Sequence, residues 1–194
     1  MICQALLGGS FDPVHNGHLH IAREILRSSI AQTVVFLPNA RHNFKRDSVL
    51  LDYPHRRELV AAVLEPSMEV WDDDAQGSGY TADLLKHLYQ KHPDHVFLWV
   101  IGSDNIAGLP RWYDFQWLKA NARFLIIPRP GYSADEKILK RIRRKTLKIS
   151  PSEVSSTLVR DRIKAGESIT DLVPERIAKR VLRLYKPLLA GHAR

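Results

Sequence analysis

The sequence has few of the features that mark secreted, membrane-spanning or disordered proteins. Its single cysteine, Cys3, excludes an intrachain disulfide and a cysteine-based zinc site. No stretch approaches the ~18 uninterrupted apolar residues of a membrane-spanning helix, and the first residues lack the basic and apolar segments of a secretion signal. No long tract of Pro, Gly and Ser interrupts the chain. We therefore expect a cytoplasmic globular protein without a membrane anchor, in which Cys3 is a small core residue.

What is present fits one domain. The chain has 194 residues, of which 44% are hydrophobic and 26% are charged, and it contains no visible linker or internal repeat. Because single domains commonly span ~100–200 residues, we expect one domain over residues 1–194. The sequence does not decide between a monomer and a homo-oligomer.

The charge balance is basic. Twenty-nine Lys and Arg residues against 21 Asp and Glu residues give a net charge of +8, which favours anionic ligands such as phosphates or nucleic acids. Much of the excess lies between Lys137 and Lys148, with a spacing that predicts a helix with a solvated basic face. This stretch has no aromatic residues that could stack on bases, so it favours a solubilising surface over nucleic-acid binding.

Apolar runs and amphipathic segments alternate along the chain. Runs typical of strands cover residues 2–7, 33–37, 68–71, 96–101 and 124–127. Helical spacing recurs at residues 18–26, 57–64 and 80–91. Such alternation predicts an α/β fold that is Rossmann-like and doubly wound, with a mostly parallel sheet and helices on both faces. Two consecutive helices, expected from about residue 155 onward, form a small C-terminal extension packed on the same domain.

A glycine-rich turn follows the first expected strand and leads into a helix. The turn begins with Gly8, Gly9, Ser10 and Phe11. Glycines let the backbone approach a ligand closely, and the amides at a helix start attract phosphate oxygens. The turn lacks the Lys-Ser/Thr ending of a P-loop, so the imidazoles of His15 and His18 are the nearest candidates for its cationic groups. Such a pair is also typical of surface or capping histidines, but its place after a strand and a Gly-Gly turn favours a phosphate site.

A second phosphate-binding helix start is predicted far along the chain. Ser155 or Ser156 can cap a helix whose free amides bind phosphate oxygens. Thr157 lies in its first turn, and Arg160, about one turn in, can add a charge-assisted fork. A plain capped amphipathic helix with Arg160 in solvent would have the same sequence. Two such helix starts, each where an α/β fold would place a ligand, nevertheless predict that both converge on one triphosphate.

These two motifs resemble the signature of the nucleotidylyltransferase superfamily. Its (His/Thr)-x-Gly-His motif is matched by residues 15–18, and its Ser-Ser-Thr-x-x-Arg motif by residues 155–160. Over nearly the whole chain the sequence is similar to bacterial nicotinate-nucleotide adenylyltransferases, through residues 79–83, 101–112 and 128–131. The resemblance implies an enzyme that transfers AMP from ATP, with Mg²⁺, to nicotinate mononucleotide and releases pyrophosphate, a step of NAD biosynthesis.

The resemblance also implies roles for residues on the ATP side. It makes His15, His18 and Arg160 the catalytic residues, with the two helix starts and the glycine-rich turn holding the nucleotide. It places Gly102 and Asp104 near the adenosine. Asp104 is as well suited to capping the helix that follows it. No residue is predicted to ligate a metal, because Mg²⁺ is expected to arrive with ATP.

On the acceptor side, the resemblance implies that Trp112 stacks on the pyridine ring and that Tyr80 and Thr81 contact the nicotinate end. Trp112 could equally be a packing residue. Gly79 stands where the family usually has serine, and the loop at 38–47, from which Lys45 is expected to reach the substrate, matches the family loosely. Alternatives therefore stay open: nicotinamide mononucleotide or phosphopantetheine as acceptor, or a non-catalytic nucleotide- or nucleic-acid-binding protein.

Overall fold

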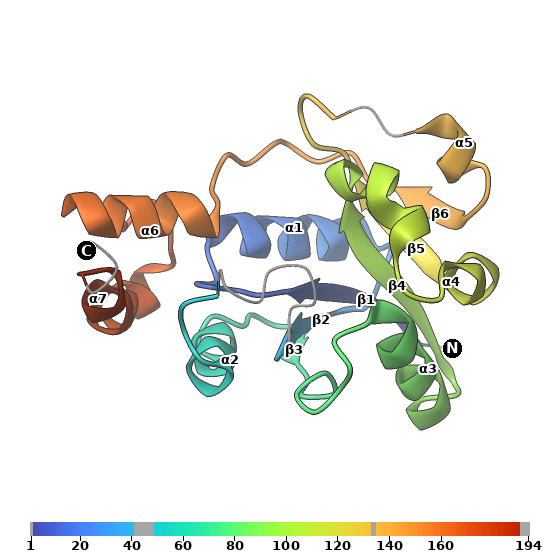
Figure 1. The fold of residues 1–194 in the computed structure, drawn as a ribbon, viewed down its shortest axis with the longest axis horizontal. Helices are drawn as coiled ribbons and strands as arrows, with labels where there is room; N and C mark the ends of the chain where they lie inside the picture. The colour runs from blue at the N-terminus through green and yellow to red at the C-terminus, as the bar shows by residue number, and fades with distance from the viewer. Residues whose placement is uncertain (1, 41–48, 133–134, 191–194) are drawn as a thin grey trace.

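The computed structural model describes residues 2–40, 49–132 and 135–190. Its strands are β1 (Ile2–Gly9), β2 (Thr33–Pro38), β3 (Met68–Val70), β4 (His95–Gly102), β5 (Arg123–Ile127) and β6 (Arg143–Thr146). Its helices are α1 (Asn16–Arg27), α2 (Tyr53–Ala61), α3 (Thr81–Lys91), the 3₁₀ helix η2 (Ser103–Arg111), α4 (Phe115–Asn121), α5 (Glu136–Leu139), α6 (Ser156–Ala165) and α7 (Glu175–Ala190). Strands and helices alternate as far as β6, and α6 and α7 follow (Figure 1).

The strands form one parallel sheet in the order β3-β2-β1-β4-β5-β6. From β1 the chain winds outward to β3 on one side, then returns to β4 and winds outward to β6 on the other. The predicted doubly wound, parallel α/β fold is confirmed. The winding direction reverses between β1 and β4, and in open sheets of this kind ligands bind beyond the carboxyl ends of the strands at that point.

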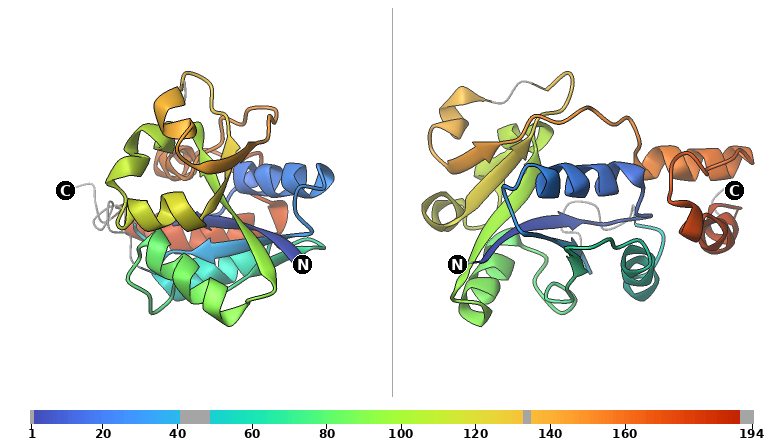
Figure 2. Two further views of the ribbon diagram at one scale, coloured as in Figure 1. Left: turned by 90° about the vertical axis from the view of Figure 1, so that its right-hand side faces the viewer. Right: turned by 180° about the vertical axis from the view of Figure 1, so that it is seen from behind.

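Alternate residues of each strand bury their side chains on opposite faces of the sheet. In β1, Ala5 and Leu7 belong to a cluster with side chains of α1, α2, α6 and α7, whereas Leu6 belongs to a second cluster with side chains of α3, η2 and α4. Helices therefore cover both faces, as Figure 2 shows from two further directions. Cys3 is half-buried and packs at the margin of the first cluster, so it is less central than expected.

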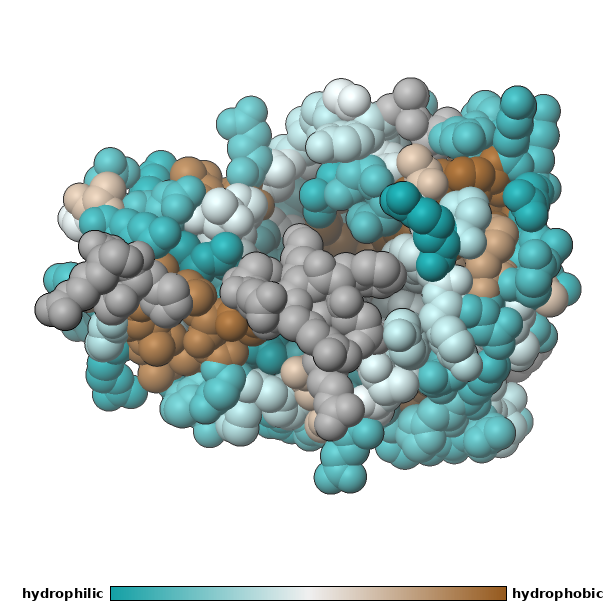
Figure 3. Space-filling model, viewed as in Figure 1, coloured by the Kyte–Doolittle hydropathy of each residue, from teal (hydrophilic) through white to brown (hydrophobic). Residues whose placement is uncertain are grey.

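The prediction of a helix between Lys137 and Lys148 is wrong. The segment forms the short helix α5 and then β6, whose residues are all exposed and whose backbone pairs with β5. Pairing with β5 satisfies backbone groups that would otherwise line an open edge, and this outweighs the helical spacing. The charged side chains keep β6 solvated. The face of the molecule shown in Figure 3 is mainly hydrophilic, and a hydrophobic area lies on it between α2 and α7.

Helix boundaries differ by a few residues from the expected ones. The helix predicted at residues 57–64 begins at Tyr53, because Asp52 caps it by accepting a hydrogen bond from the His55 amide at 3.1 Å. Across the part of the chain that the structure describes, no helix has the length and apolar character needed to cross a membrane.

Candidate active site

The turn after β1 lies at the point where the winding of the sheet reverses. A Cβ added at Gly8 would lie 2.8 Å from Cη2 of Trp99 on the neighbouring strand β4, so any larger residue would force the Trp99 ring to move. At Phe11 the backbone is left-handed, with φ of 49°, although the side chain is large and fully buried. Such strained conformations persist where the surroundings hold them, typically at ligand sites.

Asp12 anchors this turn from inside the protein. Its buried carboxylate accepts hydrogen bonds from the Leu50 amide at 2.9 Å, the Leu51 amide at 3.1 Å and the Tyr185 hydroxyl of α7 at 2.6 Å. Burial and the adjacent Asp12 carboxylate raise the pKa of Tyr185, so its hydroxyl stays protonated and acts as the donor. One side chain thus ties the turn both to the segment before α2 and to the C-terminal helix.

Arg56 of α2 is a second anchor. Its guanidinium, almost fully buried, donates to the Leu51 carbonyl at 2.8 Å, to the Asn39 carbonyl at 2.8 Å and to the Ser10 carbonyl. Burial lowers the pKa of Arg56, but an arginine remains charged at neutral pH. Because the three carbonyls belong to three separate segments, Arg56 fixes the loops after β1 and β2 relative to each other.

The second predicted motif meets the first. The Ser156 hydroxyl donates to the Pro13 carbonyl at 2.9 Å, and Nη1 of Arg160 donates to the Asp12 carbonyl at 2.6 Å. Ser155 caps α6 by accepting from the Leu158 amide at 3.1 Å. The starts of α1 and α6 consequently lie side by side, which Figures 1 and 2 both show. The predicted convergence of the two helix starts is present in the structure.

Arg160 is less free than an exposed arginine. Besides its bond to the Asp12 carbonyl, it lies 3.7 Å from Oδ2 of Asp12 and donates to Oγ1 of Thr157 at 3.3 Å. Its guanidinium is therefore held in place at the junction of the two helix starts and supplies a positive charge there. Charge that is fixed in advance needs no reorganisation when an anion binds.

The two histidines stack at the start of α1. Their ring centroids are 3.7 Å apart, and His18 also meets the edge of Phe11 at 4.8 Å. Nδ1 of His18 accepts a hydrogen bond from the His15 amide at 3.3 Å. Because Nδ1 accepts, the proton of a neutral His18 ring is assigned to Nε2, which leaves Nε2 as a donor for a ligand.

Neither histidine is cationic at neutral pH. Burial lowers the pKa of His15 to about 3, and the nearby Arg129 contributes in the same direction. Burial, then His15 and Arg129, also hold the pKa of His18 well below its usual value. The histidines are therefore neutral donors, which corrects the expectation that they supply the cationic groups. Arg129 and Arg160 carry the positive charge at this end of the sheet.

These lowered pKa values predict acid sensitivity. An unfolded histidine binds its proton near pH 6.5, whereas His15 in the folded protein stays neutral to about pH 3. The unfolded state therefore binds more protons in this range, and the free energy of unfolding falls as the pH drops below ~6.5. Urea titrations at several pH values below ~6.5 give the number of extra protons that the unfolded state binds, from the slope of the unfolding free energy against pH. Replacing His15 with Phe should lower that number by about one. A His15 ring signal that titrates near pH 6.5 in NMR spectra would contradict this assignment.

Of the residues predicted near the adenosine, Gly102 is the last residue of β4 and Asp104 lies in the first turn of η2. Asp104 does not cap η2; its Oδ2 lies 3.3 Å from Nη1 of Arg129, and Gly102 occupies the cap position. A Cβ at Gly102 would collide with the Asp104 carboxylate. Within the described residues Oδ1 of Asp104 is buried without a hydrogen-bond partner, as is Nδ1 of His15. Buried polar atoms without partners are rare and call for an explanation, and a hydrogen bond to a bound ligand would supply one here.

The residues predicted for the acceptor also come together. Tyr80 is the residue before α3 and its ring stacks on that of Tyr113 at 4.6 Å, while Trp112, half-buried, packs on the second core cluster. Thr81 is the first residue of α3. Tyr80 and Tyr113 are among the few large apolar side chains that are exposed in the described structure. Lys45 lies outside the described residues.

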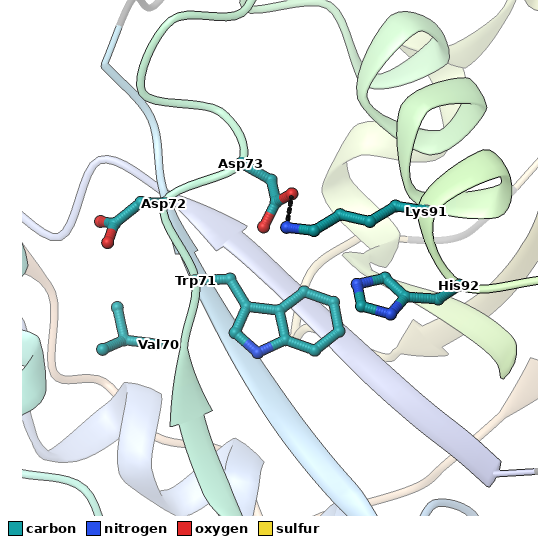
Figure 4. A pocket seen from close by; sticks show the side chains of 6 residues that line it. All are labelled: Val70, Trp71, Asp72, Asp73, Lys91 and His92. Carbon is teal, nitrogen blue, oxygen red and sulfur yellow. Dashed lines mark hydrogen bonds and ion pairs between the residues drawn. The ribbon is translucent and has the colours of Figure 1, made fainter.

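The acidic run at residues 72–74 joins neighbouring elements. Asp72 accepts bonds from Tyr53 and Arg57, and Asp73 accepts from Lys91 and from His87. Figure 4 shows Asp73 pointing to Lys91 while Asp72 points away, beside a pocket bounded by Trp71 and His92. Burial raises the pKa of the neighbouring Asp74 to about 6. Among the residues that the structure describes, no three or more His, Cys, Asp and Glu side chains are grouped so that they could hold a metal ion.

Comparison with known proteins agrees with this site. The model of the family described as cytidylyltransferase-like matches residues 6–162, which include both helix starts. A probable nicotinate-nucleotide adenylyltransferase of Clostridium novyi is 36% identical over 94% of this chain and 98% of its own length. The chain belongs to this family, and within it to the nicotinate-nucleotide adenylyltransferases. It is accordingly a nucleotidyltransferase.

Further relatives and solved structures are consistent with that membership. The nicotinate-nucleotide adenylyltransferase of Bacillus subtilis is 31% identical over 91% of this chain and 93% of its own length. The Plasmodium falciparum nicotinic acid mononucleotide adenylyltransferase complexed with NaAD superposes with a TM-score of 0.79, at 22% identity, covering 95% of this chain and 98% of the other. At that identity the superposition establishes the fold.

Sequence reasoning did not single out four residues of this adenylyltransferase-family site. They are Asp12, Arg56, Arg129 and Tyr185. Asp12 lies inside the turn that was singled out, and Arg129 follows the end of a strand, so both had a signal in the sequence. Arg56 and Tyr185 lie within ordinary helical patterns, and nothing in the sequence distinguishes them from neighbouring residues.

Proposed function

We propose that this protein transfers AMP from Mg-ATP to nicotinate mononucleotide and forms nicotinate adenine dinucleotide and pyrophosphate. The observation that carries this proposal is the meeting of the two helix starts. The turn with His15 and His18 and the start of α6 with Arg160 are held together by the Ser156–Pro13 and Arg160–Asp12 hydrogen bonds. Two helix N-termini, two neutral imidazoles and the guanidinium of Arg160, which is held in place, form a site suited to a triphosphate.

The chemistry that fits this arrangement is a direct in-line displacement. An oxygen of the acceptor phosphate attacks the α-phosphorus of ATP, and the bond from that phosphorus to the bridging oxygen of the β-phosphate breaks. Pyrophosphate leaves with that oxygen, so no covalent enzyme intermediate and no net proton transfer are needed. Nε2 of His18 donates to the α-phosphoryl oxygens, where charge grows in the transition state. Arg160 and the amides at the start of α6 bind the leaving pyrophosphate.

Magnesium belongs to the substrate in this proposal. Mg²⁺ is commonly bound through substrate phosphates and one or two carboxylates. In the described residues around the two helix starts, the Asp12 carboxylate is occupied by amides and the Tyr185 hydroxyl, so it is not a ligand in this arrangement. The ion therefore enters and leaves with the phosphates.

The start of α3, at the acceptor end of the site, offers backbone amides that can bind a carboxylate. The first intrahelical bond of α3 runs from the Leu84 amide to the Tyr80 carbonyl at 3.1 Å, so the amides of residues 81–83 precede it. Such amides carry partial positive charge and bind anions. Nicotinate presents a carboxylate where nicotinamide presents a neutral amide. We therefore assign the nicotinate end to the start of α3 and the pyridine ring to Trp112.

The test is pyrophosphate release from Mg-ATP with each acceptor in turn. A charge-assisted hydrogen bond contributes about 1.5–3 kcal/mol, so kcat/KM should be roughly tenfold to a hundredfold higher for nicotinate than for nicotinamide mononucleotide. Phosphopantetheine should give no release. Binding of ATP without release from any acceptor would indicate a non-catalytic nucleotide-binding protein, and a steeply salt-dependent affinity for oligonucleotides would favour a nucleic-acid-binding one.

A further inference from the structure

Lys86, on the second turn of α3, lies between acidic side chains at the acceptor end of the site. Its Nζ is 2.7 Å from Oδ2 of Asp114 and 4.0 Å from Oδ1 of Asp83, and it lies 5.4 Å from the centre of the Trp117 ring. Asp83 is in the first turn of α3, the helix whose start was assigned to the nicotinate carboxylate. Lys86 is thus the positive member of a group with two negative charges next to that helix start.

Asp114 directly follows the aromatic residues of the acceptor end. Its backbone is left-handed, with φ of 50°, and its Oδ1 caps α4 by accepting from the Trp117 amide at 3.3 Å. Tyr113, the residue before it, stacks on Tyr80. Two contacts therefore join the start of α3 to the segment that carries Trp112: the Tyr80–Tyr113 stack and the Lys86–Asp114 ion pair.

Stability alone does not account for this pair. Both side chains are about one third exposed, and exposed ion pairs contribute little to folding free energy. Their charge has a clearer consequence. Without Lys86, two carboxylates would stand beside the helix start that is to receive the carboxylate of the acceptor. Their repulsion would offset the attraction of the α3 amides.

We propose that Lys86 is a specificity-determining residue, which neutralises Asp83 and Asp114 and so keeps the acceptor end receptive to a carboxylate. This inference rests on the proposed function, since it concerns the choice between nicotinate and nicotinamide mononucleotides. It assigns to Lys86 no contact with either substrate. Lys86 acts through the local charge: in the unaltered protein its one positive charge stands against the two negative charges of Asp83 and Asp114.

Three variants change that charge in a defined order. Lys86→Met keeps an unbranched side chain of similar length, removes the ammonium group that lies over the Trp117 ring, and leaves two negative charges. Asp114→Asn keeps the cap and the left-handed backbone, for which asparagine is well suited, and leaves the group neutral. The double variant carries one net negative charge, as the unaltered protein does. Lys91→Met is the matched control, because it breaks an ion pair at the far end of the same helix and removes the same total charge.

The measurement is the ratio of kcat/KM for nicotinate mononucleotide to that for nicotinamide mononucleotide. Lys86→Met should lower this ratio about three- to fivefold at low ionic strength and less in 0.5 M salt, because charges near the surface are screened. Asp114→Asn should keep or raise the ratio, the double variant should return it close to the original value, and Lys86→Arg should retain it. KM for ATP should change less than twofold in all of them.

The outcomes separate this inference from the proposed function. If the unaltered protein releases pyrophosphate with neither mononucleotide, the proposed function fails. If it is active but Lys86→Met leaves the ratio unchanged, or Lys91→Met lowers it equally, the role of Lys86 is overturned. A fall in the ratio for Asp114→Asn as large as that for Lys86→Met would likewise show that structure, and not charge, is responsible.

Discussion

Replacing His18 with alanine should lower kcat by about a hundred- to a thousandfold while the fold stays intact. The expected magnitude is that of removing one preorganised donor to a developing negative charge. His18 qualifies because its ring is fixed between His15 and Phe11, with centroids 3.7 and 4.8 Å away, and its Nδ1 already accepts a bond, so Nε2 is left to donate. KM for ATP should change less than kcat, because the contact strengthens in the transition state.

His20 offers a matched control on the same helix. Its Nε2 lies 2.8 Å from the Ser150 carbonyl, outside the junction of the two helix starts, so His20→Ala removes an imidazole and one hydrogen bond without touching the proposed site. Pyrophosphate release should stay within about twofold of the unaltered rate, and circular dichroism should show both variants folded. A His18→Ala protein that retains a rate within a few-fold of normal would remove His18 from the mechanism.

The parts of the site that the sequence predicted are those whose signals are local. The Gly8-Gly9 turn and the Ser155 cap each depend on backbone geometry within a few residues, which composition at those positions reveals. Their convergence followed from the parallel sheet, because the carboxyl ends of parallel strands share one edge. Tyr80 and Trp112 were assigned to the acceptor end through the family resemblance, and the structure joins their two segments through Tyr113.

What sequence reasoning missed depends on contacts between distant segments. Asp12 and Tyr185 are 173 residues apart in the chain, and Arg56 and Ser10 are 46 apart, yet each pair forms a hydrogen bond. No periodicity encodes such a pair, and each residue fits an ordinary turn or helix pattern. The prediction that His15 and His18 carry positive charge was wrong for a related reason. Their pKa values depend on burial and on the nearby Arg129, which become visible after the chain has folded.

Edge strand β6 illustrates a different limit. Its residues, Arg143 to Thr146, are charged or polar and all exposed, so neither alternation nor an apolar run marks a strand. It forms because β5 has a free edge, and backbone pairing does not require apolar side chains. Edge strands with Lys and Arg are common since these side chains discourage pairing between molecules. The predicted sheet was therefore right in type and one strand short.

Replacing Asp12 with asparagine should have the largest effect on stability of any change in this site. The Asp12 carboxylate accepts from two backbone amides and from Tyr185, and it faces Arg160 at 3.7 Å. The side-chain NH₂ group of an asparagine would face one of these hydrogen-bond donors in place of an oxygen. The negative charge beside Arg160 would also be lost. Breaking a buried, hydrogen-bonded charge in this way costs about 3–5 kcal/mol. Urea unfolding should show that loss as a lower midpoint without a change in slope.

The same substitution should raise KM for ATP at least about tenfold, because the turn and α6 are both fixed through Asp12 and small misplacements of binding groups are costly. Tyr185→Phe is the graded comparison: it removes one donor and leaves the carboxylate its two amides and Arg160, so the expected loss is about 1 kcal/mol. If Asp12→Asn unfolds at the original midpoint, the carboxylate does not hold the turn. If it is destabilised but binds ATP normally, the two helix starts are positioned by other contacts, and the Ser156–Pro13 bond becomes the one to test.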